Sequence, residues 1–189
     1  MAQNDNAVLV IGAGNYFTNS SVGAALPADL LDVNAGIVAP APMWENVGHT
    51  SLEEILSIAS EGGDATTIGT LQNKSLRTTY SARQETINFT LQQFDTPALK
   101  LFYGSNATVG SQGEVQVPTN PTPTVAAFLA VFIDGANHFA IYAPKAEIFR
   151  AADVSVSDTE SLAGLPLAVK PLVNGTNKWA YAVTPLGSV

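Results

Sequence analysis

Residues capable of metal or nucleophilic chemistry are scarce in this sequence. It contains two histidines, His49 and His138, and no cysteine. Protein zinc sites are built mainly from cysteine and histidine, so a site here would have to recruit carboxylates from distant loops. The Gly-x-Ser-x-Gly pattern of a nucleophile elbow is absent as well. We therefore expect neither a metal site nor a catalytic triad.

Two other patterns begin like functional motifs but are incomplete. The apolar run Val8–Ile11 leads into Gly12-Ala13-Gly14, as in a dinucleotide-binding turn, but Phe17 stands where the third glycine is required. The pattern is more typical of a strand that leads into a glycine-permitted bend. Glu53 and Glu54 are adjacent, so on a helix their side chains would diverge by about 100°. We predict that the chain is not an enzyme and that it binds no cofactor.

The elements that would position these residues are mostly strands. Between Gln84 and Gln93 the apolar residues Ile87, Phe89 and Leu91 alternate with polar ones, which predicts a half-buried strand. The stretch Lys178–Thr184 alternates in the same way. Val125–Ile133 and His138–Tyr142 flank a short Gly- and Asn-containing loop, which predicts a hairpin whose first strand is buried on both faces. Further strands are expected within 147–157 and 167–173.

Two segments carry helix signals. Thr50–Ala59 has a capping residue followed by glutamates, and Gly62-Gly63 would end it. Asp95–Gly104 is the stronger case, with a capping aspartate, a proline in the first turn and a terminal glycine. Two long loops, Gly23–Pro42 and Gly110–Thr124, complete a fold that we expect to be mainly β.

Charge is sparse and unevenly distributed. Charged residues make up 13% of the chain. The net charge of −8 argues against a protein that binds nucleic acid through its phosphates, because such binding requires basic patches. Residues 1–73 contain eight acids and no Lys or Arg, and Lys74, Arg77 and Arg83 follow within ten residues. This pattern has two interpretations: a solvated acidic surface beside a basic hairpin, or head-to-tail complementarity between subunits. The shortage of charge favours a surface that partner subunits cover.

No targeting segment or membrane span is expected. The N-terminus is polar and lacks the basic residues of a signal peptide, and the longest apolar run, Val125–Ile133, is about half the length of a membrane helix. We expect a soluble protein made in the cytoplasm, with no membrane partner.

Seven segments lie in a fixed order along nearly the whole chain: Gly14–Phe17, Val22–Pro27, Trp44–Ser51, Ser60–Asn73, Ala98–Gly104, Tyr142–Glu147 and Tyr181–Gly187. Together they resemble the major tail tube protein of phages with long non-contractile tails (siphovirus type), and in particular that of actinobacteriophages. The resemblance implies a β-sandwich or barrel with one flanking α-helix and long inter-subunit loops. It also implies one tail tube domain over residues 1–189, with a flexible N-terminal arm at residues 1–6 and no C-terminal immunoglobulin-like domain.

Function follows from the same resemblance. It implies a virion protein of the tail whose homohexameric rings stack into a tube, with a lumen through which double-stranded DNA passes. Because the chain is acidic, we expect this lumen to be negatively charged and to conduct the DNA without binding it specifically. A tape measure protein and a tail terminator are the implied partners. Because the basic residues follow a long acidic stretch, residues Ala65–Ser81 are predicted to form a hairpin that reaches a neighbouring ring, with Lys74 and Arg77 at or near its tip. Lys74, Arg77 and Arg83 are the candidate contact residues between rings. The alternatives are a tail terminator, a capsid decoration protein, or an extracellular β-sandwich that binds a ligand.

Overall fold

The structure is a computed structural model, and it describes residues 3–4, 7–28, 30, 44–154, 156, 162–175 and 177–187. The predicted arm Met1–Asn6 and the loop Gly23–Pro42 lie for the most part outside the described residues. The elements are β1 (Ala13–Asn19), β2 (Glu45–Asn46), β3 (Ser57–Gly62), β4 (Ala65–Ile68), β5 (Arg77–Tyr80), β6 (Arg83–Leu91), α2 (Thr96–Tyr103), β7 (Thr108–Val109), β8 (Val115–Gln116), β9 (Thr124–Asp134), β10 (Asn137–Arg150), β11 (Leu165–Pro171) and β12 (Ala182–Val183).

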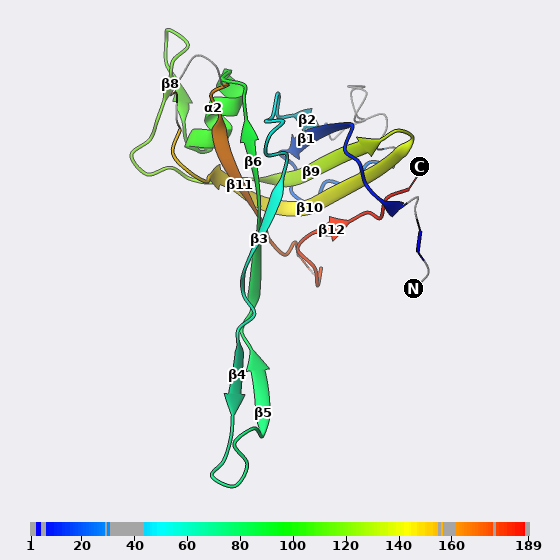
Figure 1. Cartoon of the computed structure of the whole chain (residues 1–189). Coiled ribbons are helices and arrows are strands. Elements are labelled where there is room, and N and C mark those ends of the chain that lie inside the picture. The colour runs from blue at the N-terminus through cyan, green and yellow to red at the C-terminus, as the bar shows by residue number, and fades with distance from the viewer. Residues whose placement is uncertain are drawn as a thin grey trace.

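One antiparallel sheet forms the body of the protein (Figure 1). Its strand order is β2-β1-β9-β10-β11-β6-β3, and β12 pairs with β10 outside this path. The ladder between β9 and β10 shifts register between Ala143 and Ala146, and such a bulge lets a long strand bend. The mainly β fold predicted from the sequence is confirmed.

The segment 45–51 connects two distant strands of this sheet. At its start, β2 pairs with β1, and the Val47 N–H donates to the Tyr16 carbonyl. At its end, the Gln92 N–H donates to the His49 carbonyl and the Ser51 N–H donates to the Thr90 carbonyl, both beside the end of β6. The two sides of the curved sheet are therefore tied together in a barrel-like arrangement.

Strand β9 lies at the centre and is buried on both faces, as its uninterrupted apolar sequence predicts. Its even-numbered residues, such as Phe128, belong to the larger core together with β6, where Ile87, Phe89 and Leu91 are buried as predicted. Its odd-numbered residues, such as Leu129, belong to a second core on the opposite face.

Tyr16 of β1 is at the centre of the larger core. Its ring stacks on Phe89 with centroids 4.6 Å apart and meets Phe132 edge-on at 5.8 Å. Its hydroxyl donates a hydrogen bond to the Ile55 carbonyl, just ahead of β3. Burial raises the pKa of this hydroxyl well above its ordinary value. The contact fixes the segment from which β3 departs.

The Gly-x-Gly pattern near the N-terminus has a packing role. The chain bends at Gly12 as predicted, but the strand begins after the bend, at Ala13, so the prediction of a strand over Val8–Ile11 is wrong. Gly14 lies inside β1, opposite Phe132, and a Cβ there would lie 2.7 Å from the Phe132 ring. The glycine is required because an aromatic side chain crosses its Cα.

One of the two predicted helices exists. Helix α2 is capped by Asp95, whose Oδ1 accepts a hydrogen bond from the Ala98 N–H at 3.0 Å, and Gly104 ends it. Ala98 and Phe102 pack into the larger core. The helix predicted over Thr50–Ala59 is wrong, because its last three residues, Ser57–Ala59, belong to β3 and pair with β6. That ladder satisfies the backbone groups of β3 that face β6, while Ile55 and Leu56 pack against the core.

The remaining strand predictions differ in length. The strand predicted over Lys178–Thr184 is reduced to β12, and the strand expected within 147–157 is the end of β10, which stops at Arg150. The loop Gly110–Thr124 contains β8, which pairs with β7 in a small hairpin.

Candidate assembly surfaces

A long two-stranded stem projects from the body (Figure 1). The ladder of β3 and β6 runs outward to the pair Gly62 and Arg83, and β4 and β5 continue it to Ile68 and Arg77. At about 3.3 Å per residue, the six residues beyond Gly62 alone reach about 20 Å. Every residue from 64 to 84 is exposed. The predicted hairpin over Ala65–Ser81 is therefore present as the distal part of this stem.

A glycine pair joins the two halves of the stem. Gly62 and Gly63 have φ of 82° and 78°, and a Cβ on Gly62 would lie 2.3 Å from the Ala82 carbonyl oxygen. Across the joint, the Ser81 N–H donates to the Asp64 carbonyl and the Asp64 N–H donates to the Ser81 hydroxyl. These glycines shape the stem and do not end a helix.

The loop at the end of the stem is held by its own hydrogen bonds. The Leu76 N–H donates to the Ile68 carbonyl, and the Thr70 N–H donates to the Asn73 carbonyl. The Asn73 side chain accepts a hydrogen bond from the Ser75 N–H at 3.1 Å. Leu71 is 89% exposed and Leu76 60% exposed. Residues 69–77, which we call the tip, thus present apolar side chains that nothing in the described chain covers.

The structure brings two of the three predicted contact residues together. Lys74 lies in the tip loop and Arg77 opens β5, so both belong to the tip. Arg83 opens β6 opposite Gly62, at the body end of the distal hairpin. Residues 65–84 contain no acid. The one ion pair among the described residues is Arg150–Asp153, so no carboxylate of the described chain pairs with the tip cations.

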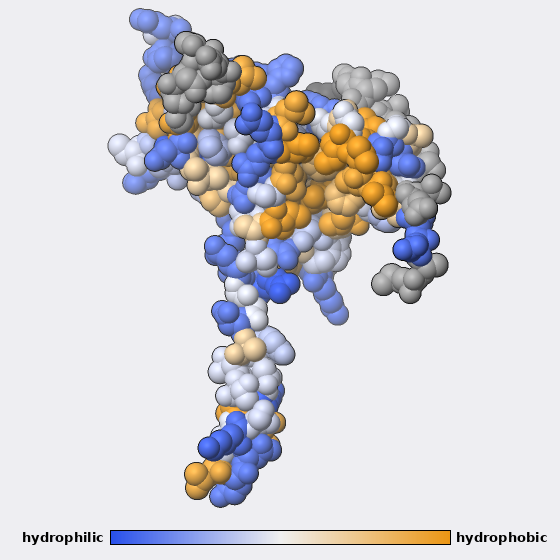
Figure 2. Space-filling view, viewed as in Figure 1, coloured by the Kyte–Doolittle hydropathy of each residue, from blue (hydrophilic) through white to orange (hydrophobic). Residues whose placement is uncertain are grey.

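A second surface is an apolar groove beside the root of the stem. It has a volume of about 300 Å³, and its lining is entirely apolar: Leu9, Ile11, Ile55, Leu56, Ile58, Phe132, Phe139 and Ile141. Apolar side chains gather over the middle of the body in Figure 2, next to the root of the stem. Ile58 belongs to β3, which pairs on one side with β6 and has no strand on its other side among the described residues. Sequence reasoning missed this groove.

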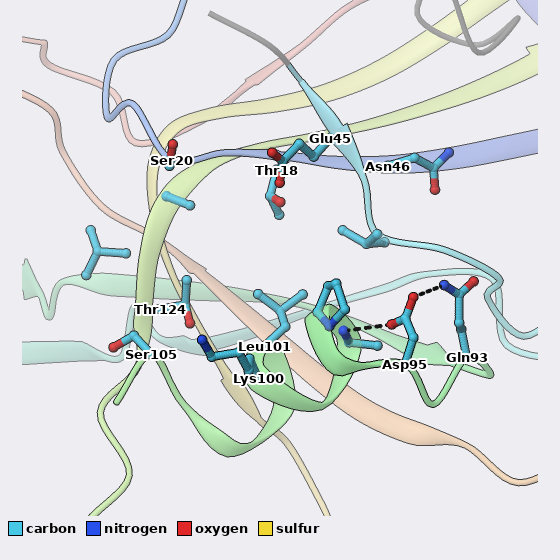
Figure 3. Close-up of a pocket in the computed structure, with 15 residues that line it drawn as sticks. Thr18, Ser20, Glu45, Asn46, Gln93, Asp95, Lys100, Leu101, Ser105 and Thr124 are labelled. Atoms are coloured by element: carbon cyan, nitrogen blue, oxygen red, sulfur yellow. Dashed lines mark hydrogen bonds between the residues drawn. The ribbon is translucent and has the colours of Figure 1, made fainter. Parts of the chain in front are cut away.

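A third surface is a polar groove between α2 and the strands β1 and β2 (Figure 3). Its volume is about 420 Å³. Glu45 approaches from β2 and Lys100 from α2, while Asp95 caps the helix and also accepts a hydrogen bond from the Gln93 amide. Apolar atoms of Val47, Leu101 and Val125 line its floor. Sequence reasoning did not find this groove either.

The described residues contain no group of three or more His, Cys, Asp or Glu side chains that could hold a metal ion. His49 and His138 lie in different elements: His49 is in the segment 45–51 that connects β2 to the end of β6, and His138 is buried in β10. Across the same parts of the chain, no helix is long and apolar enough to span a membrane.

Comparison with known proteins gives one consistent result. A family model described as "Phage tail tube protein" matches residues 1–184. The major tail protein Gp23 of Mycobacterium phage D29 is 33% identical over 174 residues, which cover 88% of this chain and 85% of the relative. The Gp23 major tail protein of Mycobacterium phage L5 is 33% identical over 173 residues, with the same two shares. The resemblance seen in the sequence is confirmed, and the chain belongs to the phage tail tube protein family.

Proposed function

We propose that this chain is the subunit of homohexameric rings that stack into the tail tube of a phage, whose lumen conducts the genome during ejection. The observation that carries the proposal is the exposed stem. An isolated two-stranded hairpin is at best marginally stable in water. This one also ends in exposed leucines and in cations that pair with no carboxylate of the described chain. Contact with a neighbouring subunit would bury the leucines and give the cations acidic partners.

Within a ring, the apolar groove and the outer edge of β3 form the contact between neighbours. An unpaired strand edge offers backbone N–H and C=O groups to another strand, and exposed apolar side chains beside it gain free energy when they are buried. A second copy of the chain is the partner, because a ring requires each subunit to contact the next one heterologously. The N-terminal segment takes part, since Leu9 and Ile11 line the groove.

The lumen is proposed to be negatively charged. The chain has 16 acids against 8 basic residues, and a ring multiplies this excess. Duplex DNA carries one phosphate charge per about 1.7 Å of axis, so a negative wall repels it and prevents adhesion during passage. A tape measure protein within the tube and a terminator at its end are the further partners. Assembly takes place in the host cytoplasm before the tail joins the virion.

Electron microscopy of the concentrated protein tests the proposal. We expect the unmodified chain to form stacked rings or tubes. A chain with both Lys74→Glu and Arg77→Glu should remain folded and form no tubes, because its tip then repels an acidic neighbour. Lys170→Glu with Lys178→Glu makes the same change in net charge outside the tip and serves as the control. Normal tubes from the tip variant would refute the role of these two cations.

The N-terminal arm and the loop Gly23–Pro42 are proposed to add inter-subunit contacts. A chain lacking residues Met1–Asn6 should assemble at a higher critical concentration than the full chain. Light scattering during a dilution series measures this concentration, and an unchanged value would exclude the arm from the contact.

A further inference from the structure

We propose that the tip of one subunit docks in the polar groove between α2 and β2 of a subunit in the next ring. This inference rests on the proposed function and adds to it the place where the stem binds. The occupant of the groove is therefore a second copy of this chain, through residues 69–77.

The placement of the two surfaces carries the first part of the argument. The stem leaves the body on one side, whereas α2 and β2 lie at the opposite end of the molecule (Figure 1). A copy displaced along the stem direction brings its tip to the α2 end of the next copy. Because the two surfaces differ, the contact is heterologous and repeats without limit, as a stack of rings requires.

The chemistry of the two surfaces is complementary. The tip has Lys74 and Arg77 and lacks acids, while the groove is lined by two acids, Glu45 and Asp95, and one basic residue, Lys100. Opposite charges at the rim steer the approach of two surfaces and fix their register. Leu71 and Leu76 find apolar partners in the floor residues Val47, Leu101 and Val125.

The size of the groove fits this occupant. A volume of about 420 Å³ lies within the range of sites that enclose a small ligand, about 300–1,000 Å³, and accommodates a few side chains of a turn. The tip is also ordered in advance by the Thr70, Asn73 and Ser75 hydrogen bonds. An ordered loop loses less conformational entropy on docking than a flexible one.

The apolar groove beside β3 is the competing receptor, and it fits less well. Its lining contains no carboxylate, so Lys74 or Arg77 entering it would lose water without gaining a partner. It also adjoins the root of the same subunit's stem, since Ile58 belongs to β3. A neighbour seated there would contact the root of the stem, which suits a contact within a ring.

Cysteine cross-linking tests the docking directly, because the natural chain has no cysteine. One chain carries Leu71→Cys in the tip together with Ser20→Cys at the edge of the groove. A control chain pairs Leu71→Cys with Ser111→Cys, which is exposed in the β7–β8 loop away from the groove. Both are assembled, confirmed as tubes by electron microscopy, and treated with a short bis-maleimide.

The groove chain should give a ladder of covalent trimers and longer oligomers on a denaturing gel, because each subunit carries both halves of the contact. A mixture of two chains that each carry one cysteine, Leu71→Cys in one and Ser20→Cys in the other, should form covalent heterodimers and no longer oligomers. Intact tubes whose groove chain cross-links no more than the Ser111 control would overturn the docking and leave the tube function standing. Protein that forms neither rings nor tubes would instead overturn the proposed function, and the micrographs reveal this before cross-linking.

A charge exchange gives an independent readout. Glu45→Lys should lower tube yield by about tenfold while rings remain, and adding Lys74→Glu in the same chain should restore it. Restoration requires that the two residues face each other. A double variant no better than Glu45→Lys alone would overturn the pairing.

Discussion

Removal of the Tyr16 hydroxyl should weaken both the fold and the root of the stem. The hydroxyl donates to the Ile55 carbonyl, two residues before β3, while the ring stacks on Phe89. Tyr16→Phe keeps the ring and loses one partly buried hydrogen bond, so we expect a loss of about 1–2 kcal/mol in unfolding free energy. Tyr16→Ala also removes the ring and should cost about 3–5 kcal/mol.

Urea denaturation measures both losses, and the protein has to be monomeric because assembly makes apparent stability depend on concentration. The Ile58→Glu chain, whose substitution lies in the proposed contact within the ring, supplies that background. Hydrogen exchange gives the local effect: the amides of β3 should exchange faster in Tyr16→Phe than in the parent, while those of β9 change only with global stability. An unfolding free energy within about 0.3 kcal/mol of the parent would refute the contribution of this hydrogen bond.

The same variant has a predictable pH dependence. Burial raises the pKa of Tyr16 in the folded protein, so the folded state holds this proton more tightly than the unfolded state does. The contribution of the protonated Tyr16 hydroxyl to the unfolding free energy is complete below the pKa of tyrosine in the unfolded state, about 10, and is lost as the pH rises above that value. The stability difference between the parent and Tyr16→Phe should therefore narrow above about pH 10. A constant difference up to pH 11 would contradict the assignment.

Three further variants test separate parts of the structure. Gly62→Ala places a Cβ 2.3 Å from the Ala82 carbonyl oxygen, at a residue whose φ is positive. The substitution should distort the stem at a cost of about 1–3 kcal/mol and reduce tube yield, while the near-ultraviolet circular dichroism of the body stays unchanged. Asp95→Ala should lower stability by about 1 kcal/mol in thermal melts through loss of the helix cap, whereas Asp95→Asn should retain most of it. His138→Leu should raise stability by about 1 kcal/mol in urea, because His138 is 2% exposed and neither ring nitrogen has a hydrogen-bond partner among the described residues; a loss of stability would show that the ring is needed for packing.

Local sequence signals predicted the elements whose own residues decide their structure. Alternation of Ile87, Phe89 and Leu91 located β6, and the capping Asp95 located α2. The helix prediction for Thr50–Ala59 was wrong because the end of this segment pairs with β6, a strand that the local sequence pattern does not include. Ile58 pairs with Ile87 across the β3–β6 ladder, some thirty residues along the chain, and the ladder overrides the local preference.

The same distinction separates the surfaces. The tip could be predicted because one short segment contains its basic residues, and charge patterning along the chain shows this. The two grooves could not, because residues distant in sequence form each of them. Leu9 and Phe139 both line the apolar groove, and Glu45 and Lys100 both line the polar one. Such sites exist only after the sheet has closed.

The proposed contacts also determine the order of assembly. A single tip that buries about one leucine gains about 2 kcal/mol, which corresponds to a dissociation constant of about 30 mM. One subunit therefore does not hold another by its tip alone at cellular concentrations. The proposed hexameric ring would present six tips at once, and its later contacts would form at a high effective concentration, so stacked rings would be held by about 12 kcal/mol before the entropic cost of association. On this proposal, rings close before they stack.

This order can be tested at the apolar groove. Ile58→Glu places a charge in the proposed contact within the ring and leaves the tip and the polar groove unchanged. We expect the variant to remain folded and to form neither rings nor tubes, because isolated tips bind too weakly to stack. Val109→Glu adds the same charge at an exposed apolar residue of β7 and should assemble normally. Single-file filaments of Ile58→Glu would show that one tip suffices, and would refute the requirement for a closed ring.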